Sequence, residues 1–230
     1  EVVRLIQRAS ASDVLTFCEE QLQLIGIRVD AEAAVVGQTM QELMQAHPNT
    51  DFRVKAILRG ETTLLPKGRE RIHPEDHLFV MVRPSDVSAV TRIMGKEETR
   101  IRHIMITGGT RVGASIARRI MHACPDCRIK LIEPDAERAE QLAADLPEVL
   151  VIQGDATEVD LLVEEGLKDM DAFIAVSDAE EANLVTCLMA KEFGVYKTVA
   201  QLSKVAYIPM SEHLGLDAAV SPKLAVSREV

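Results

Sequence analysis

The chain has 230 residues, of which 47% are hydrophobic and 27% charged, a composition typical of one large or two small globular domains. A formal net charge of −10 and an aromatic content of 3% argue against nucleic acid as a partner, because phosphates require a basic surface and bases stack on aromatic side chains. No apolar run approaches the ~20 residues of a membrane-spanning helix, and the first residues lack the pattern of a signal peptide, so we expect a cytoplasmic protein.

The first hundred residues alternate between short strands and short helices. Residues 1–8 have the pattern of the second half of a helix, and residues 222–230 resemble its first half, as in a segment taken from a tandem repeat. Alternating apolar and polar residues predict three strands, over residues 52–58, 62–65 and 78–82. Apolar residues at helical spacing predict two helices, over residues 37–44 and 86–94. We therefore expect a trailing helix within residues 1–12 and a small α+β domain over residues 13–96.

A charged connector, residues 96–100, separates this domain from a more regular pattern. Apolar runs predict five strands, over residues 103–107, 128–133, 149–153, 172–177 and 198–202. Helical patterns lie between them, the clearest over residues 112–123 and 136–145. Because parallel strands require crossover helices, residues 101–230 are predicted to form an α/β domain with a Rossmann-like, doubly wound parallel sheet.

Two of the four cysteines, Cys124 and Cys127, form a Cys-Pro-Asp-Cys motif between the first helix and the second strand of this domain. A zinc site would need two further ligands nearby. A redox pair is the alternative, but the sequence favours an ordinary helix-to-strand loop.

A glycine-rich turn follows the strand 103–107, at the place where a Rossmann domain binds the pyrophosphate of a dinucleotide. Its residues are Gly108-Gly109-Thr110-Arg111-Val112-Gly113. Backbone N–H groups and the positive end of the helix dipole face the ligand in such a turn. Thr110 replaces the middle glycine of the usual pattern, and its side chain is expected either to crowd the pyrophosphate or to donate a hydrogen bond to it.

Polar residues at other strand ends strengthen the prediction of a nucleotide site. Glu133 ends the second strand, 20 residues after Gly113, where a carboxylate can accept hydrogen bonds from both ribose hydroxyls and repel a 2′-phosphate. Asp155 follows the third strand, where a ligand contact and a cap on a helix beginning near Thr157 are equally good interpretations. Each position lies at the carboxyl ends of the strands, where open α/β sheets bind their ligands.

Groups suited to catalysis are missing from this pattern. Hydride transfer to a carbonyl requires a positioned proton donor, and Tyr196 and Lys197 are adjacent rather than one helical turn apart. The sequence therefore favours a binding module over an enzyme. An NAD-dependent oxidoreductase and a degenerate repeat that serves only assembly are the alternatives.

The motifs taken together resemble the RCK (KTN) domain. They are the glycine-rich turn, Glu133, Gly154-Asp155-Ala156-Thr157, residues 171–177, Glu181-Ala182-Asn183 and residues 215–222. The upstream domain resembles the C-terminal lobe of an RCK unit, with residues 36–39 opening its helix and 57–60 in its central strand and turn. A lobe followed by a Rossmann domain fits the middle of a protein with two tandem RCK units.

The resemblance implies a cytoplasmic regulatory subunit, peripheral on the inner face of the membrane, that assembles into a ring beneath a membrane-embedded potassium transporter subunit. It implies that NAD(H), or alternatively ATP or ADP, binds the Rossmann domain and gates potassium transport. The binding residues implied are Gly108, Gly109, Thr110, Arg111, Val112, Gly113, Glu133, Asp155, Ala156, Val176, Ser177 and Ala200.

Overall fold

The computed structural model describes residues 2–7, 13–17, 21–96, 99–204 and 206–221. The predicted helical pattern at residues 222–230, the remainder of the segment 1–12, and Cys18 lie outside these ranges. The chain divides into two compact units, a parallel unit (Glu1–Gln7 and Arg100–Val230) and an antiparallel unit (Arg8–Thr99). Among the described residues, no helix combines the length and the apolar character that crossing a bilayer requires.

The antiparallel unit is a five-stranded sheet with strand order β1-β2-β5-β3-β4 and two helices. Its elements are β1 (Asp13–Phe17), β2 (Leu22–Arg28), α2 (Met40–Ala46), β3 (Phe52–Arg59), β4 (Thr62–Leu64), β5 (His77–Val82) and α3 (Val87–Ile93). The predicted strands and helices of this unit are present, with their ends shifted by a few residues. Strands β1 and β2 were not predicted, and β2 pairs with β5 in the centre of the sheet.

One charged cluster connects two parts of this sheet. Asp76, which is fully buried, accepts hydrogen bonds from Nε and Nη2 of Arg59 at 2.8 and 2.9 Å. It also accepts one from the backbone N–H of His73 at 2.8 Å. Arg59 ends β3 and Asp76 immediately precedes β5, so the ion pair holds the turn that leads into β5.

The parallel unit contains a six-stranded sheet in which every neighbouring pair is parallel. Its elements are α1 (Val2–Gln7), β6 (His103–Thr107), α4 (Arg111–Ala123), β7 (Arg128–Glu133), α5 (Ala136–Asp145), β8 (Leu150–Gln153), α6 (Val159–Glu164), β9 (Ala172–Ala175), α7 (Glu180–Glu192), β10 (Lys197–Gln201), α8 (Tyr207–His213) and β11 (Ala218–Val220). The strand order β8-β7-β6-β9-β10-β11 is that of a doubly wound nucleotide-binding sheet. The predicted fold class is confirmed.

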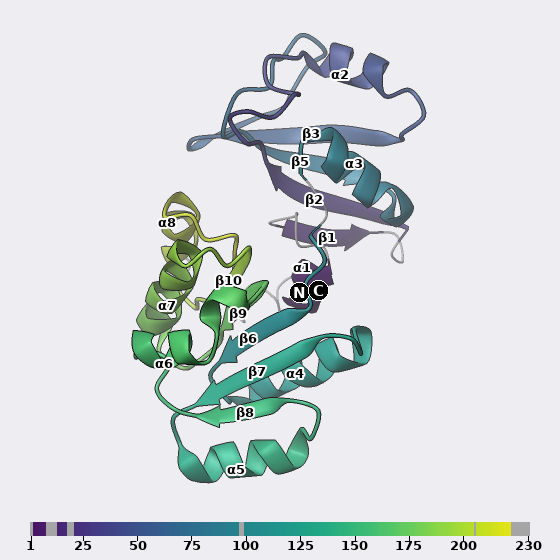
Figure 1. The fold of residues 1–230 in the computed structure, drawn as a ribbon. Helices are drawn as coiled ribbons and strands as arrows, with labels where there is room; N and C mark the ends of the chain where they lie inside the picture. Colours follow the sequence, from purple (N-terminus) through teal and green to yellow (C-terminus); the bar gives the residue numbers. More distant parts are fainter. Residues whose placement is uncertain (1, 8–12, 18–20, 97–98, 205, 222–230) are drawn as a thin grey trace. The chain divides into compact units, whose positions relative to one another are not determined.

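Helices cover this sheet, as expected for buried parallel strands. Leu162 of α6 and Leu184 and Cys187 of α7 share one apolar cluster with Met105 of β6 and Phe173 of β9. Figure 1 shows α6, α7 and α8 gathered on one side of the sheet. From β6 the chain adds β7 and then β8 on one side, and it then returns to place β9 on the other side of β6. The strand order therefore reverses between β6 and β9. Crevices for ligands form at such points.

Candidate nucleotide-binding site

The glycine-rich turn leaves β6 in a conformation that its glycines make accessible. Gly108 has a φ of +96°, which L side chains rarely adopt, and a Cβ atom there would lie 2.6 Å from the backbone nitrogen of Ser177. A Cβ atom on Gly113 would clash with the carbonyl oxygen of Gly108. The first and last glycines of the motif therefore allow the close approach of β6, α4 and the end of β9.

Thr110 is the N-cap residue of α4. Its hydroxyl oxygen accepts a hydrogen bond from the backbone N–H of Gly113 at 3.1 Å, and the hydroxyl donates to the carbonyl oxygen of Val176 at 3.1 Å. The side chain is thus bound to the helix and to the end of β9. This arrangement explains how the motif accommodates a threonine in place of its middle glycine.

The first turn of α4 retains free donors. Gly113 donates its backbone N–H to Thr110, and Ala114 donates to the carbonyl oxygen of Thr110. Within the described part of the chain, the backbone N–H groups of Arg111 and Val112 have no acceptor in hydrogen-bonding distance. With the positive end of the helix dipole, these two groups can bind an anionic oxygen such as that of a phosphate.

Glu133 lies at the end of β7, beside the glycine-rich turn, and is 6% exposed. Its Oε2 accepts a hydrogen bond from the backbone N–H of Gly109 at 2.7 Å, and its Oε1 accepts one from that of Asp135 at 3.1 Å. A carboxylate has about four acceptor positions, so hydroxyl donors can still be bound. The side chain both fixes the turn and faces the cavity beside it.

Two further residues connect the site to neighbouring helices, and neither was predicted as a ligand residue. Nε of Arg138, in the first turn of α5, donates to the carbonyl oxygen of Gly109 at 2.8 Å. Asn183, buried in α7, accepts hydrogen bonds from the backbone N–H and hydroxyl of Ser177 at 3.0 and 2.6 Å and donates one to the Ser177 carbonyl at 2.8 Å. In the sequence, the RCK-like motif Glu181-Ala182-Asn183 is the pattern that could have identified Asn183 as a site residue.

Asp155 belongs to a tight turn after β8. Its Oδ1 accepts hydrogen bonds from the backbone N–H and the hydroxyl of Thr157, both at 2.8 Å, and these bonds hold the pKa of the carboxyl below its usual value. The interpretation as a helix cap is wrong, because α6 begins at Val159 and its N-cap residue is Glu158.

Half of the predicted site residues surround one cavity of about 380 Å3. Those lining it are Gly108, Thr110, Glu133, Asp155, Ala156 and Ser177, together with Arg138 and Asn183. Gly109 and Gly113 contribute to the turn that forms its wall.

Four predicted residues do not line this cavity. Arg111 and Val112 line a different cavity, together with Val2 and Val3 of α1. Val176 and Ala200 are fully buried, and Ala200 packs in the apolar cluster beneath α7. Ala200 was carried over from the RCK resemblance, and its position in this apolar cluster keeps it out of the cavity lining.

Comparison with known families supports the fold and the resemblance. The sequence profile of the TrkA-N domain matches residues 104–222, and that of the TrkA-C domain matches residues 24–95. The Trk system potassium uptake protein TrkA of Vibrio alginolyticus is 32% identical over 97% of this chain and 48% of its own length. A Methanosarcina mazei protein described as Trk system potassium uptake protein trkA homolog 1 is 32% identical over 100% of this chain and 56% of its own. The chain spans about half the length of these relatives.

Solved structures share the fold over nearly the whole chain. The GsuK RCK domain superposes with a TM-score of 0.61 at 16% identity, covering 99% of this chain and 50% of that chain. The GsuK channel bound to NAD superposes with a TM-score of 0.61 at 17% identity, covering 99% of this chain and 41% of that chain. The predicted resemblance to RCK domains is thereby confirmed at the level of the fold. Because the TrkA-N profile matches more than half of the residues and TrkA relatives align from end to end, the chain belongs to the TrkA family.

Proposed function

We propose that this chain is the nucleotide-sensing part of a regulatory subunit of a potassium uptake transporter. NAD(H), or alternatively ATP or ADP, binds the cavity beside the glycine-rich turn, and a membrane-embedded potassium transporter subunit is the partner. The proposal places the protein in the cytoplasm, peripheral on the inner face of the membrane, in a ring formed by RCK domains. The names of the TrkA relatives and of the NAD-bound GsuK channel support it.

The observation that carries the proposal is the position of Glu133 in the wall of the cavity, bonded to the glycine-rich turn that leads into α4. The N–H groups of Arg111 and Val112 would hold a phosphate, and the carboxylate of Glu133 would accept hydrogen bonds from the ribose hydroxyls. A 2′-phosphate would meet the negative charge of Glu133, so NAD(H) is favoured over its phosphorylated form. The cavity volume, at the lower end of the range for small-molecule sites, suits a mononucleotide or one half of a dinucleotide.

Sensing requires that the ligand bind one conformation better than another. The cavity is suited to this because it touches three helices. The turn leads into α4, Arg138 connects the turn to α5, and Asn183 connects Ser177 to α7. A ribose bound at the remaining acceptor positions of Glu133 would share this carboxylate with the backbone N–H of Gly109 and so alter the bond that holds the turn. Occupancy would therefore change the contacts that fix these helices to the turn.

Isothermal titration calorimetry of the chain with NADH, NAD, ATP and ADP tests the proposal. We expect binding of at least one of them, and we expect Glu133→Ala to weaken NAD(H) binding at least tenfold, because charged acceptors contribute about 1.5–3 kcal/mol per hydrogen bond. Glu140→Ala, on an exposed part of α5 away from the cavity, is the matched control and should bind as the unmodified chain does.

Each alternative has its own outcome in this experiment. Unchanged affinity in Glu133→Ala would contradict the role of the carboxylate. No binding of any nucleotide would favour a repeat that serves only assembly. Steady NADH consumption in the presence of carbonyl compounds would favour an oxidoreductase, and the proposal as a regulator would then be wrong.

A further inference from the structure

The Cys-Pro-Asp-Cys loop lies between α4 and β7, on the opposite edge of the parallel sheet from the nucleotide cavity. Cys124 is the C-cap residue of α4, and Cys127 immediately precedes β7. A disulfide joins them, with their Cα atoms 5.5 Å apart, within the range of ordinary disulfides. We propose that this pair is a reversible thiol–disulfide site whose oxidants are disulfide compounds, and that its redox state acts on the segment Arg100–Arg102.

A stabilising cross-link is a poor explanation for this bond. The gain from a disulfide grows with the length of the loop that it closes, and only two residues separate these cysteines. The loop is also closed without it, because the backbone N–H of Cys127 donates to the carbonyl oxygen of Cys124 at 3.0 Å. The two sulfur atoms therefore remain neighbours after reduction, and the bond can form again.

Metal binding is likewise a poor explanation. A structural zinc site needs four ligands, usually cysteine or histidine. Within the ranges that the structure describes, no group of three or more histidine, cysteine or acidic residues is placed to hold a metal ion. The Cys124–Cys127 pair is thus a dithiol without further ligands in that part of the chain.

The two cysteine residues differ in accessibility. Cys124 is half-buried, whereas Cys127 is 4% exposed. In the oxidation step, the Cys124 thiolate attacks one sulfur of an external disulfide, forms a mixed disulfide and releases one thiolate. Cys127, as a thiolate, then attacks the Cys124 sulfur and releases the second. Two electrons pass from the dithiol to the external disulfide, and the protons of both cysteines end on the released thiolates or in solvent.

The position of the cysteine pair makes its thiol–disulfide exchange slow. Thiolates are stabilised at the N-terminal end of a helix, and Cys124 lies at the C-terminal end of α4, where the partial negative charge opposes them. Rapid exchange with successive protein disulfides is therefore not its role. A site that equilibrates slowly and reversibly with the redox poise of its surroundings agrees with this placement.

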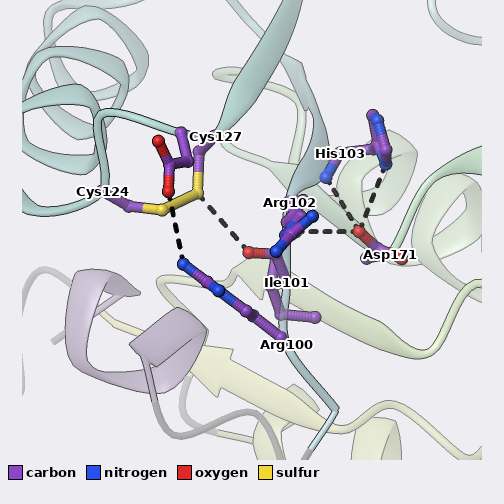
Figure 2. The surroundings of a disulfide bond; sticks show 8 residues. Arg100, Ile101, Arg102, His103, Cys124, Cys127 and Asp171 are labelled. Carbon is purple, nitrogen blue, oxygen red and sulfur yellow. Dashed lines mark hydrogen bonds and ion pairs between the residues drawn. A yellow bond between two sulfur atoms is a disulfide. The ribbon is translucent and has the colours of Figure 1, made fainter.

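The loop holds the segment by which the chain enters the parallel unit. Sγ of Cys127 lies 3.5 Å from the carbonyl oxygen of Ile101 (Figure 2). The carboxylate of Asp126 pairs with Arg100 at 3.3 Å. The backbone N–H of Arg128 donates to the carbonyl oxygen of Arg102 at 2.7 Å.

On its other side, the segment is held by Asp171. Oδ2 of Asp171 accepts hydrogen bonds from the backbone N–H groups of Arg102 and His103, both at 2.8 Å (Figure 2). A disulfide sulfur carries no hydrogen, so Cys127 can donate to Ile101 only after reduction. Reduction therefore adds a hydrogen bond to this segment, and oxidation removes it.

A thiol count on the full chain tests reversibility. The chain is equilibrated with mixtures of reduced and oxidised dithiothreitol, quenched in acid, alkylated after denaturation and weighed. We expect a single two-electron step in which two alkyl groups are lost, both assigned to Cys124 and Cys127 by peptide masses, and their recovery on reduction. Cys187, fully buried and with its thiol pKa raised by burial, should stay reduced throughout. Two thiols that stay free in every mixture, or a bond that native protein does not release, would overturn the proposal.

Single-cysteine variants test the order of attack. With glutathione disulfide, Cys127→Ser should form a mixed disulfide at Cys124 at least tenfold faster than Cys124→Ser does at Cys127. The serine that replaces Cys127 can still donate to Ile101, so the fold of this variant is expected to persist. Equal rates would show that the assigned order is wrong.

Hydrogen exchange tests the action on the segment. Between the reduced and oxidised chains, the exchange rates of the Arg102, His103 and Arg128 amides should differ at least threefold. The amide of Leu43, which bonds Thr39 in the antiparallel unit, should exchange equally in both. Identical rates at all four amides would leave a redox pair without the proposed effect and would refute that part of the inference.

Discussion

Thr110 shows how one residue can depart from a binding motif without loss of the local geometry. A glycine at this position would leave the backbone N–H of Gly113 without its side-chain acceptor and the carbonyl oxygen of Val176 without its donor. The threonine supplies both from one hydroxyl group. At the helix terminus its side chain accepts only the N–H of Gly113. In the described part of the chain, the N–H groups of Arg111 and Val112 have no acceptor and can bind an anion.

We predict that Thr110→Val, which retains the shape but removes the hydroxyl, destabilises the parallel unit by about 1 kcal/mol, the usual contribution of an N-cap. Urea unfolding followed through hydrogen exchange of the β6 amides measures this. Ser115→Ala, on the exposed face of the same helix, is the control and should leave stability within about 0.5 kcal/mol. A Thr110→Val variant as stable as this control would show that the cap contributes nothing.

The sequence identified those site residues that lie at or directly after the end of a predicted strand. Gly108 was identified because it directly follows a predicted strand and Glu133 because it ends one, and the carboxyl ends of parallel strands lie at one edge. Arg138 was not, because an arginine in the first turn of a helix has the pattern of a solvent-exposed residue. Its bond to the carbonyl oxygen of Gly109 depends on how α5 packs beside the turn, which no local pattern contains.

At the level of elements, the ion pair Arg59–Asp76 contributes more to the stability of the antiparallel unit than the exposed ion pairs of that unit do. Asp76 has no exposed surface and binds three donors, two of them on a guanidinium that is itself only 29% exposed. The pKa of Arg59 is raised, chiefly by the hydrogen bond to Asp76. By contrast, Asp51 and Arg83 form an ion pair at 3.3 Å with both side chains more than 60% exposed.

We predict that Asp76→Ala destabilises the antiparallel unit by about 2–3 kcal/mol. It removes the acceptor of two bonds from Arg59 and of the bond from the N–H of His73. Breaking a buried ion pair costs about 3–5 kcal/mol, less here because Arg59 is partly exposed and still pairs with Glu70 at 3.2 Å. Asp51→Ala removes an exposed pair and should change stability by less than about 1 kcal/mol. Urea denaturation monitored at the β5 amides compares the two, and equal effects would contradict the prediction.

Elements were predictable where the local pattern is strong. The apolar run of β6 predicted this strand with its observed bounds, because strands buried on both faces are continuous apolar segments. The bounds of β7 were also predicted correctly, from Ile129, Leu131 and Ile132 in a segment that alternates with charged residues at its start. β2 was missed although it is central, since Gly26 interrupts its apolar pattern and its pairing with β5 joins residues far apart in the chain. β11 has only three residues, which is too short for a periodicity to show.

At the level of the whole molecule, the division into two units means that ligand binding should stabilise only one of them. The residues that line the nucleotide cavity all belong to the parallel unit. A nucleotide at a hundred times its dissociation constant should stabilise that unit by about 2.7 kcal/mol. We predict slower hydrogen exchange in β6 and β9 and unchanged exchange in β3 and β5. Equal protection of both units would show that they respond as one body and would contradict the prediction.

The pairing of β6 with β9 also has a consequence for biosynthesis. The hydroxyl of Thr110 bonds a carbonyl that lies 66 residues later in the chain, at Val176. At ~5–20 residues per second, the ribosome needs roughly 3–13 seconds to make that interval. For that time, the newly made glycine-rich turn has no β9 beside it and no cavity to close. A nucleotide can therefore select the finished sheet but cannot guide the growing chain towards it.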